Sequence, residues 1–312
     1  MTKGNSGTMA EEKGMLLNIN STQSPVTTSS YDRILNPVLI TIYTVVFIGG
    51  VCGVIRMSSL LMKMNALSVT TTAIINLVAI HSLFLVTVPF RLYYYSTGDW
   101  IFQIFFCKLV SIMVHLHMYL TFLFYVIILV TRCLIFFKKK DKVEFYRNLH
   151  AVAMSTAVWF LTLVAIGPVM YLWYGKRGEY SNNKCFIFHQ ELEVSAVKVV
   201  NYILIVIMIV ITCALLGLQV FMLQKVVKMI SGSIFLHQEF RAQLKSLIFV
   251  LVSIFCFLPH HLFRIYYIQH WNKKPYLTIY NEVFLSITAL SCLDLFSFVI
   301  GEMKLLRPKI CC

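Results

Sequence analysis

Charged residues are scarce in this chain of 312 residues, since only 13% are Asp, Glu, Lys or Arg while 59% are hydrophobic. A water-soluble domain carries about twice that share of charge. Lipid must therefore be the solvent for most of the chain. The opening residues also lack the apolar core that a cleaved signal peptide requires, so we expect the first membrane-spanning helix to direct insertion itself.

The signatures of enzymes are missing as well. The sequence has no Gly-rich phosphate loop, no Gly-x-Ser-x-Gly elbow and no metal-ligand spacing. The adjacent His260 and His261 point to different faces of a helix and suit no zinc site. We therefore expect no catalysis, no metal and no cofactor. A repeated half-chain pattern is also missing, and charged residues within the apolar stretches are few, which disfavours a transporter or channel.

Seven long apolar stretches dominate the chain instead. Each exceeds the roughly 20 residues that a helix needs to cross a bilayer. Because these stretches show no strand-like alternation, their backbone hydrogen bonds must close within helices. The predicted fold class is an all-α membrane protein, a seven-transmembrane helix bundle with a short amphipathic C-terminal helix. The predicted spans are 36–62, 67–95, 104–137, 151–174, 194–227, 244–269 and 276–300.

This pattern predicts three regions and a topology. Residues 1–35 form a disordered extracellular tail, residues 36–300 the membrane domain, and residues 301–312 a short cytoplasmic tail. An odd number of spans puts the termini on opposite sides, and the basic excess, which includes Lys138, Lys139 and Lys140, predicts a cytoplasmic C-terminus. The net charge of +14 is thus a topology signal, and we expect no nucleic-acid binding. The sequon at Asn20 fits an extracellular, glycosylated tail.

The nine cysteines divide by compartment. Cys107 begins the third span on the outer side and Cys185 precedes the fifth, so the two can oxidise to a disulfide that holds the loop over the helix mouth. Cys311 and Cys312 follow basic residues; they are either acylated, which would hold the tail at the membrane, or unmodified. The others lie in or beside spans, where a thiol packs as a small hydrophobe. These are Cys52, Cys133, Cys213, Cys256 and Cys292.

Short motifs distributed over the spans resemble those of one family. They are Asn76-Leu77-Val78-Ala79-Ile80-His81 with Thr87-Val88-Pro89-Phe90, Trp159 with Pro168, Cys256-Phe257-Leu258-Pro259, and Leu290-Ser291-Cys292-Leu293-Asp294-Leu295. Together with the spacing between Cys107 and Arg132, they are similar to the rhodopsin-like G-protein-coupled receptors. The resemblance implies a multi-pass plasma-membrane receptor for a small extracellular ligand. It also implies a heterotrimeric G protein as partner, engaged when the third and sixth helices open, with membrane lipids around the bundle.

Departures from the family pattern fall on its activation switches. Thr131 replaces the acid before Arg132, Phe257 replaces the sixth-helix Trp, and His81 replaces the second-helix Asp that helps to hold sodium. A sodium site built like that of the family is therefore not expected. The departures also leave open an alternative, a receptor-like protein that signals weakly or serves as a scaffold or dimer partner.

Two contacts are predicted to act as switches. Arg132 would pair with Glu239 at the inner end of the sixth span and hold the resting state, unless Glu239 lies in a solvated charge cluster. His81 and Asp294, which the resemblance places on facing helices, would form an ion pair or share a hydrogen bond. An unperturbed His titrates near 6.5, so this pair either responds to acidification or is purely structural. Phe257 and Pro259 complete the predicted switch residues.

The ligand is predicted to bind at the outer end of the bundle. His261, Arg264 and Tyr267 share a helix face beyond the Pro259 kink. Arg recognises carboxylates and phosphates, and apolar walls favour a hydrophobic body, so we expect an anionic lipid or nucleotide-like ligand. Glu282 stands where related receptors carry basic residues, which disfavours a polyphosphate. The arginines either meet the ligand, snorkel, or pair with Glu282. The candidate ligand-binding residues are Arg91, His115, Met118, Tyr119, His261, Arg264, Tyr267 and Glu282.

Overall fold

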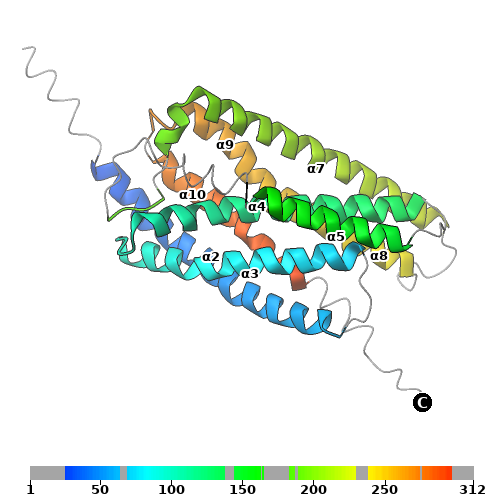
Figure 1. Cartoon of the computed structure of the whole chain (residues 1–312). Helices are drawn as coiled ribbons and strands as arrows, with labels where there is room; N and C mark the ends of the chain where they lie inside the picture. The colour runs from blue at the N-terminus through cyan, green and yellow to red at the C-terminus, as the bar shows by residue number, and fades with distance from the viewer. Residues whose placement is uncertain are drawn as a thin grey trace, which may run out of the picture.

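The structure is a computed structural model in which long helices run side by side along a common axis (Figure 1). The elements that it describes are all helical, so the predicted all-α bundle is confirmed. We call its two ends the Cys107 end, where the third span begins, and the Arg132 end, where that span finishes. The described residues are 25–63, 69–137, 144–162, 164, 183–186, 189–229, 238–274 and 276–296.

The helices follow the order of the predicted spans. Spans one to three are α2 (Pro25–Leu61), α3 (Val69–Thr97) and α4 (Ile104–Phe137), and spans four and five are α5 (Glu144–Leu161) and α7 (Ser195–Met229). The sixth comprises α8 (Gln238–Val252), the π-helical turn η4 (Ser253–Phe257) and α9 (Leu258–His270), and the seventh comprises α10 (Leu277–Ala289) and the 3₁₀ turn η5 (Leu290–Asp294). A 3₁₀ turn, η2 (His189–Glu193), precedes α7.

Several helix boundaries differ from the predicted ones. α2 begins at Pro25, inside the segment predicted as a tail, because proline suits the first turn of a helix. α5 begins at Glu144, ahead of the predicted start at residue 151. Within the described residues, five helices are long and apolar enough to cross a membrane. Asn20, Cys311, Cys312, Lys138–Lys140, the ends of spans four and seven, and the predicted C-terminal helix lie outside the described residues.

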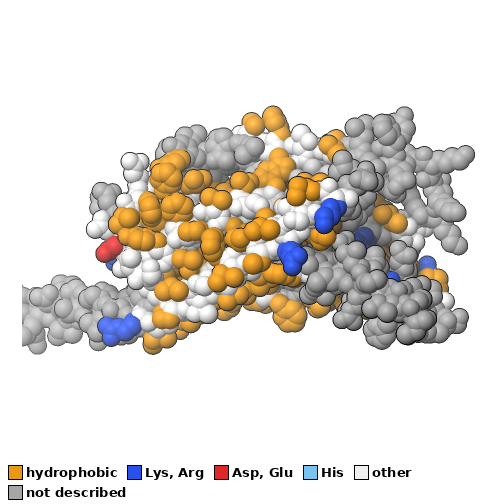
Figure 2. All heavy atoms as spheres, turned by 90° about the horizontal axis from the view of Figure 1, so that it is seen from below, with side chains coloured by type: hydrophobic (Ala, Val, Ile, Leu, Met, Phe, Trp, Pro, Cys, Tyr) orange, Lys and Arg blue, Asp and Glu red, His pale blue; other side chains and the backbone are white. Residues whose placement is uncertain are grey.

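The flanks of the bundle are apolar, as Figure 2 shows for one face. Large exposed side chains include Ile48 and Ile55 on α2, Val206 and Val210 on α7, and Phe255 on η4. Such a continuous apolar surface would aggregate in water, whereas lipid tails solvate it.

Small residues let α2 lie close to its neighbours. A Cβ atom added to Gly50 would lie 2.8 Å from the Leu85 side chain on α3, and one added to Gly53 would lie 3.4 Å from Leu295, just after η5. Glycine at such positions is typical of helix contacts in membranes, where packing replaces the hydrophobic effect. The contacts place α2 against both α3 and the end of η5.

Two of the motif residues join α3 to α5. The Trp159 indole Nε1–H donates to Asn76 Oδ1 at 2.6 Å, and Asn76 Nδ2 donates to Ser155 Oγ at 2.9 Å. Polar side chains that pair across helices inside a bilayer hold those helices in one relative position. The motif residues Asn76 and Trp159 therefore have a structural role here.

The sixth span widens just before its proline. The backbone N–H of Leu258 donates to Ser253 O, five residues earlier, instead of to the residue four earlier. Pro259 has no N–H to donate, so the regular ladder is interrupted at the next step as well. The Phe257 side chain at this turn is buried and contacts the rings of Phe122 and Tyr125 on α4.

Candidate functional site

The disulfide between Cys107 and Cys185 is present, as predicted, and joins the start of α4 to the segment before α7. The backbone N–H of Trp100 also donates to Asn183 O at 2.9 Å, so the segment is held at two points. Phe186, which follows Cys185, has a φ of 66°, a left-handed conformation that is rare for a bulky residue. This anchored segment directs the Phe186 ring down into the Cys107 end of the bundle, where it is buried.

Arg91 of α3 forms a buried ion pair with Glu282 of α10. Arg91 Nη1 lies 3.1 Å from Glu282 Oε2 and 3.2 Å from the Tyr43 hydroxyl, and the Tyr95 hydroxyl donates to the same carboxylate oxygen at 3.0 Å. The Arg91 side chain is fully buried. Its guanidinium lies 4.2 Å from the centroid of the Phe186 ring, which covers it. Of the alternatives left open by the sequence, the structure contains the pair between Arg91 and Glu282.

Arg264 of α9 lies in a different environment, between α7 and α10. Its Nη1 donates to Asn281 Oδ1 at 2.9 Å and its Nε to Asn201 Oδ1 at 3.4 Å, while its guanidinium lies 5.1 Å from the centroid of the Tyr267 ring. Both acceptors are neutral amides. Within the described part of the chain, no carboxylate lies at ion-pair distance from Arg264.

Other predicted ligand residues lie on the helices around Arg264. The rings of Tyr119 and His261 face each other across α4 and α9, with centroids 6.2 Å apart. His261 is buried, and its Nε2 has no hydrogen-bond partner among the described residues. His115 is half-buried and its Nδ1 contacts Ser111 O at 3.0 Å, whereas Met118 is fully buried in the apolar core. Arg264 lies within electrostatic range of the Tyr119 and His261 rings, and its hydrogen bonds share no partner with the Arg91 pair.

The interior carries a second polar cluster, which contains the predicted contact between His81 and Asp294. His81 Nε2 lies 3.2 Å from Asp294 Oδ1, and the Tyr125 hydroxyl donates to Asp294 Oδ2 at 2.5 Å. The other His81 nitrogen, Nδ1, lies 2.9 Å from His117 Nε2. Cys292 packs in the core as predicted, and its Sγ also lies 3.3 Å from His117 Nε2.

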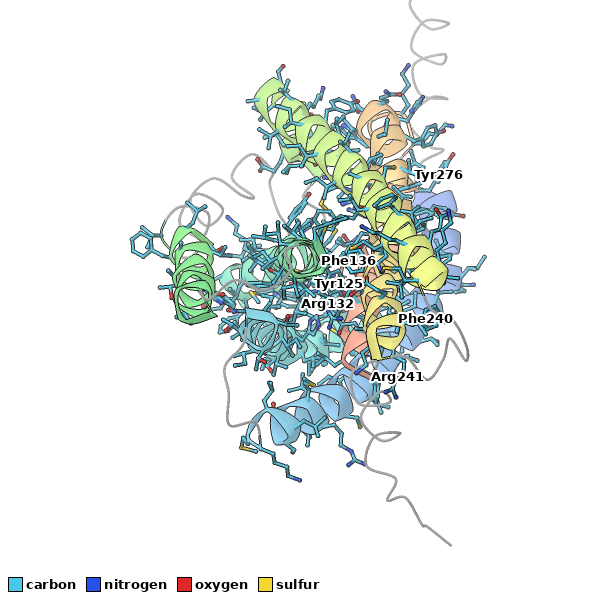
Figure 3. The ribbon with its side chains drawn as sticks, turned by 90° about the vertical axis from the view of Figure 1, so that its right-hand side faces the viewer. Tyr125, Arg132, Phe136, Phe240, Arg241 and Tyr276 are labelled. Atoms are coloured by element: carbon cyan, nitrogen blue, oxygen red, sulfur yellow. A yellow bond between two sulfur atoms is a disulfide. The ribbon has the colours of Figure 1, made fainter. Side chains whose placement is uncertain are left out.

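At the Arg132 end, Arg132 joins α4 to the start of the sixth span. Arg132 Nη1 donates to the backbone oxygen of Ala242 at 2.8 Å. Figure 3 shows Arg132 between α4 and α8, with Phe240 on the facing helix. The Glu239 side chain lies outside the described residues, so its pairing with Arg132 stays a prediction. A further link runs from α7 to α8, where Gln219 Nε2 donates to Gln243 O at 2.8 Å.

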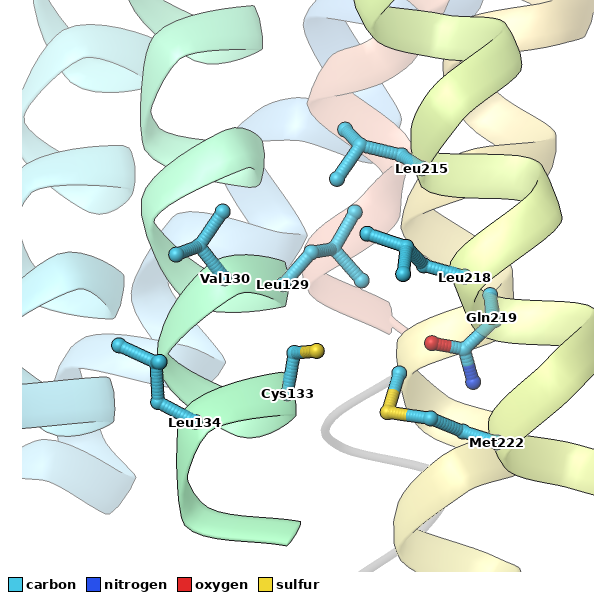
Figure 4. A pocket seen from close by; sticks show the side chains of 8 residues that line it. All are labelled: Leu129, Val130, Cys133, Leu134, Leu215, Leu218, Gln219 and Met222. Carbon is cyan, nitrogen blue, oxygen red and sulfur yellow. The ribbon is translucent and has the colours of Figure 1, made fainter. Parts of the chain in front are cut away.

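A pocket near the Arg132 end lies between α4 and α7 (Figure 4). A second one lies between α2 and α3. Neither is lined by a charged side chain, so both suit lipid chains better than an anionic ligand. The residues around the pocket of Figure 4 are Leu129, Val130, Cys133, Leu134, Leu215, Leu218, Gln219 and Met222.

Sequence reasoning missed several members of these groups. Asn201 and Asn281 are polar residues inside apolar spans, which is in itself a signal of function or pairing. His117 carried the same signal. For Phe186 the only signal in the sequence was its position next to the disulfide residue Cys185.

Comparison with known proteins agrees with the fold and the motifs. The family described as "7 transmembrane receptor (rhodopsin family)" matches residues 54–294. The human "Probable G-protein coupled receptor 141" is 52% identical over 286 residues, which cover 90% of this chain and 94% of that protein. The mouse "2-oxoglutarate receptor 1" is 25% identical over 73% of this chain and 68% of its own, and a purinoceptor from rat is 25% identical over 85% and 74%. The chain therefore belongs to the rhodopsin family of seven-transmembrane receptors.

Proposed function

We propose that this chain is a plasma-membrane receptor that binds an anionic extracellular ligand beside Arg264 and activates a heterotrimeric G protein. In this arrangement the N-terminus and the Cys107 end are extracellular, and the Arg132 end and C-terminus are cytoplasmic. The observation that carries the proposal is the environment of Arg264, whose acceptors are the neutral amides of Asn201 and Asn281.

Amide oxygens satisfy guanidinium N–H groups without compensating the positive charge. A carboxylate or phosphate would do both, with shorter and stronger charge-assisted hydrogen bonds. The buried His261 Nε2 offers a further polar contact, and the rings of Tyr119 and Tyr267 supply flat apolar walls. This combination favours a ligand with an acidic group and an apolar or aromatic body.

The pairing of Arg91 with Glu282 narrows the ligand class further. Arg91 is occupied by a carboxylate, so it does not contribute a free positive charge to the ligand site. Arg264 is then the main cation, which suits a ligand with one acidic group better than a polyphosphate. The names of two relatives, which refer to 2-oxoglutarate and to purines, support a small polar metabolite as the ligand.

Substitution of Arg264 tests the ligand site. We expect Arg264→Ala to weaken the response to an acidic agonist by about 100-fold in potency, because a charge-assisted contact to the half-buried Arg264 is lost. Arg264→Lys should keep part of the response, since it retains the charge without the planar fork. The measurement is a dose–response curve for carboxylate lipids, keto acids and mononucleotides at matched surface expression.

The matched control is Lys273→Ala, which removes an equal charge from an exposed position beyond the end of α9. Lys273→Ala should leave the potency unchanged. An agonist whose potency is the same on the wild type and on Arg264→Ala would contradict the proposed site.

Arg132 is the residue that we propose links the helices to the G protein. Its bond to Ala242 O joins α4 to α8, the two elements expected to separate on activation. We expect ligand-free signalling above an empty-vector control in the wild type, and its loss in Arg132→Ala. The measurement covers each class of G protein at matched surface expression.

Lys245→Ala, which removes a charge from α8 three residues after Ala242, serves as the control and should keep most of the signal. Basal activity that persists in Arg132→Ala would contradict the assigned role. Silence of the wild type with every ligand class would favour a scaffold or dimer partner, the reading that the substituted switch positions Thr131 and Phe257 support.

A further inference from the structure

Three buried side chains from three different elements meet in the middle of the bundle. They are His81 of α3, His117 of α4 and Cys292 of η5, and all are fully buried. His81 Nδ1 lies 2.9 Å from His117 Nε2, and Cys292 Sγ lies 3.3 Å from His117 Nε2 and 3.8 Å from His81 Nδ1. Each of the three atoms has a lone pair that can bind a metal ion, and the receptor's ligand site uses none of them.

We propose that His81, His117 and Cys292 bind a zinc ion. The three ligands lie in three different spans, so no short sequence motif contains them. Zinc binds nitrogen at about 2.0 Å and sulfur at about 2.3 Å, and tetrahedral angles then separate two nitrogens by about 3.3 Å and nitrogen from sulfur by about 3.5 Å. The observed separations are close to these values. A shift of about 0.5 Å in one imidazole would complete the fit.

The groups behind His81 are those that a zinc ligand needs. The second nitrogen of a zinc-bound His usually donates to a carboxylate, a backbone carbonyl or water, which fixes the tautomer and the ring orientation. His81 Nε2 has this partner in Asp294 Oδ1, and Asp294 is held in turn by the Tyr125 hydroxyl. With a proton on Nε2, His81 presents the Nδ1 lone pair to His117 and Cys292.

Charge balance favours a divalent ion, and the nitrogen and sulfur ligands favour Zn²⁺ among these. The Cys292 thiol loses its proton when it binds a metal, so one thiolate and the Asp294 carboxylate together offset the two positive charges. A neutral group costs far less inside a bilayer than a charged one. Sodium, calcium and magnesium prefer oxygen ligands, whereas imidazole and thiolate suit zinc.

The fourth position of the tetrahedron is left to water. Thr121, one turn along α4 from His117 and on the same face, is fully buried. Its hydroxyl has no hydrogen-bond partner among the described residues. A water molecule on the zinc ion would have such an oxygen as a nearby acceptor. The ion would then fasten α3, α4 and η5 to one another at the centre of the bundle.

Cobalt(II) substitution tests the proposal, because cobalt takes the ligands of zinc and, unlike zinc, absorbs light. The full chain, purified in nanodiscs and treated with a chelator, is titrated with cobalt. We expect a thiolate-to-cobalt charge-transfer band and tetrahedral ligand-field bands that saturate at one equivalent and disappear when zinc is added. Zinc itself should raise the unfolding midpoint by about 5 °C or more at a hundredfold excess over its dissociation constant.

Two variants should lose the bands, Cys292→Ser and His117→Gln, while the control Cys256→Ser should keep them. Since replacement of a proposed ligand in the core can prevent folding, a second protein keeps all three proposed ligands. It replaces Cys52, Cys133, Cys213, Cys256, Cys311 and Cys312 by Ser, so that Cys292 is the remaining free thiol, and it should keep the bands.

A folded wild type without cobalt bands and without stabilisation by zinc would overturn the proposal. Bands that vanish from the protein in which Cys292 is the remaining free thiol would do the same, because they would come from adventitious thiols. Either result would leave His81, His117 and Cys292 as a hydrogen-bonded network.

Discussion

Replacement of Glu282 by alanine is expected to lower the thermal unfolding midpoint by about 10 °C, because it removes the carboxylate partner of a buried charge. Arg91 is fully buried, and its ion-pair partner in the structure is Glu282, at 3.1 Å. The substitution also deprives the Tyr95 hydroxyl of its acceptor. A broken buried pair costs about 3 to 5 kcal/mol, more than the pair itself contributes. Thermal melting of the purified receptor in detergent measures the effect.

A double replacement separates two effects: the loss of the ion pair itself, and the cost of leaving Arg91 buried without a carboxylate. Arg91→Met combined with Glu282→Leu should recover most of the stability, because well-packed apolar residues can replace a buried ion pair at little cost. Glu282→Gln keeps an acceptor for Tyr95 and should fall between the wild type and Glu282→Ala. Equal melting of Glu282→Ala and the wild type would show that the pair does not stabilise the fold, which would reopen a ligand role for Arg91.

Loss of the Cys107–Cys185 disulfide is expected to cost about 4 kcal/mol, since the bond closes a long loop and so limits the unfolded chain. The two cysteines are 78 residues apart in sequence. The cost in the folded state adds to this, because the left-handed backbone of Phe186 persists only while its neighbours hold it. Without the anchor, the Phe186 ring can leave the Arg91 guanidinium, and water can enter.

The experiment compares the Cys107→Ser, Cys185→Ser double variant with Cys213→Ser, which replaces an exposed free cysteine on α7. Melting midpoints and surface expression should fall in the double variant and stay unchanged in the control. Phe186→Ala with the disulfide intact isolates the contribution of the ring. Equal midpoints for the double variant and Cys213→Ser would contradict the predicted role of the bond.

The fold could be predicted from the sequence because hydrocarbon permits few solutions. A stretch of apolar residues in lipid has to form a helix, so span number and order follow directly from the runs of hydrophobic side chains. The disulfide followed from the position of two cysteines on the same side of the membrane. The start of α2 at Pro25 was missed because polar residues around it interrupt the apolar run, although they are compatible with a helix.

The partners inside the bundle could not be predicted in the same way. Hydrophobicity says little about how far a helix rotates about its own axis, and packing against neighbours sets that angle. The sequence therefore identified Arg91 and Arg264 as a pair of candidate cations without separating the one that meets Glu282 from the one that meets Asn201 and Asn281. His81 and Asp294 were placed together through motif positions, whereas no motif position pointed to His117 as a third member.

The wide turn at Ser253–Phe257 sets the direction in which side chains point from the half of the sixth span nearer the Cys107 end. Each residue of a regular helix advances about 100° around the axis, so one additional residue in a single turn rotates all that follows by about that angle. His261 and Arg264 lie beyond this turn, so the turn determines the direction around the helix axis in which their side chains point. The position of the Arg264 guanidinium opposite Asn201 and Asn281 therefore depends on the number of residues in the turn at Ser253–Phe257, as well as on the residues that Arg264 contacts.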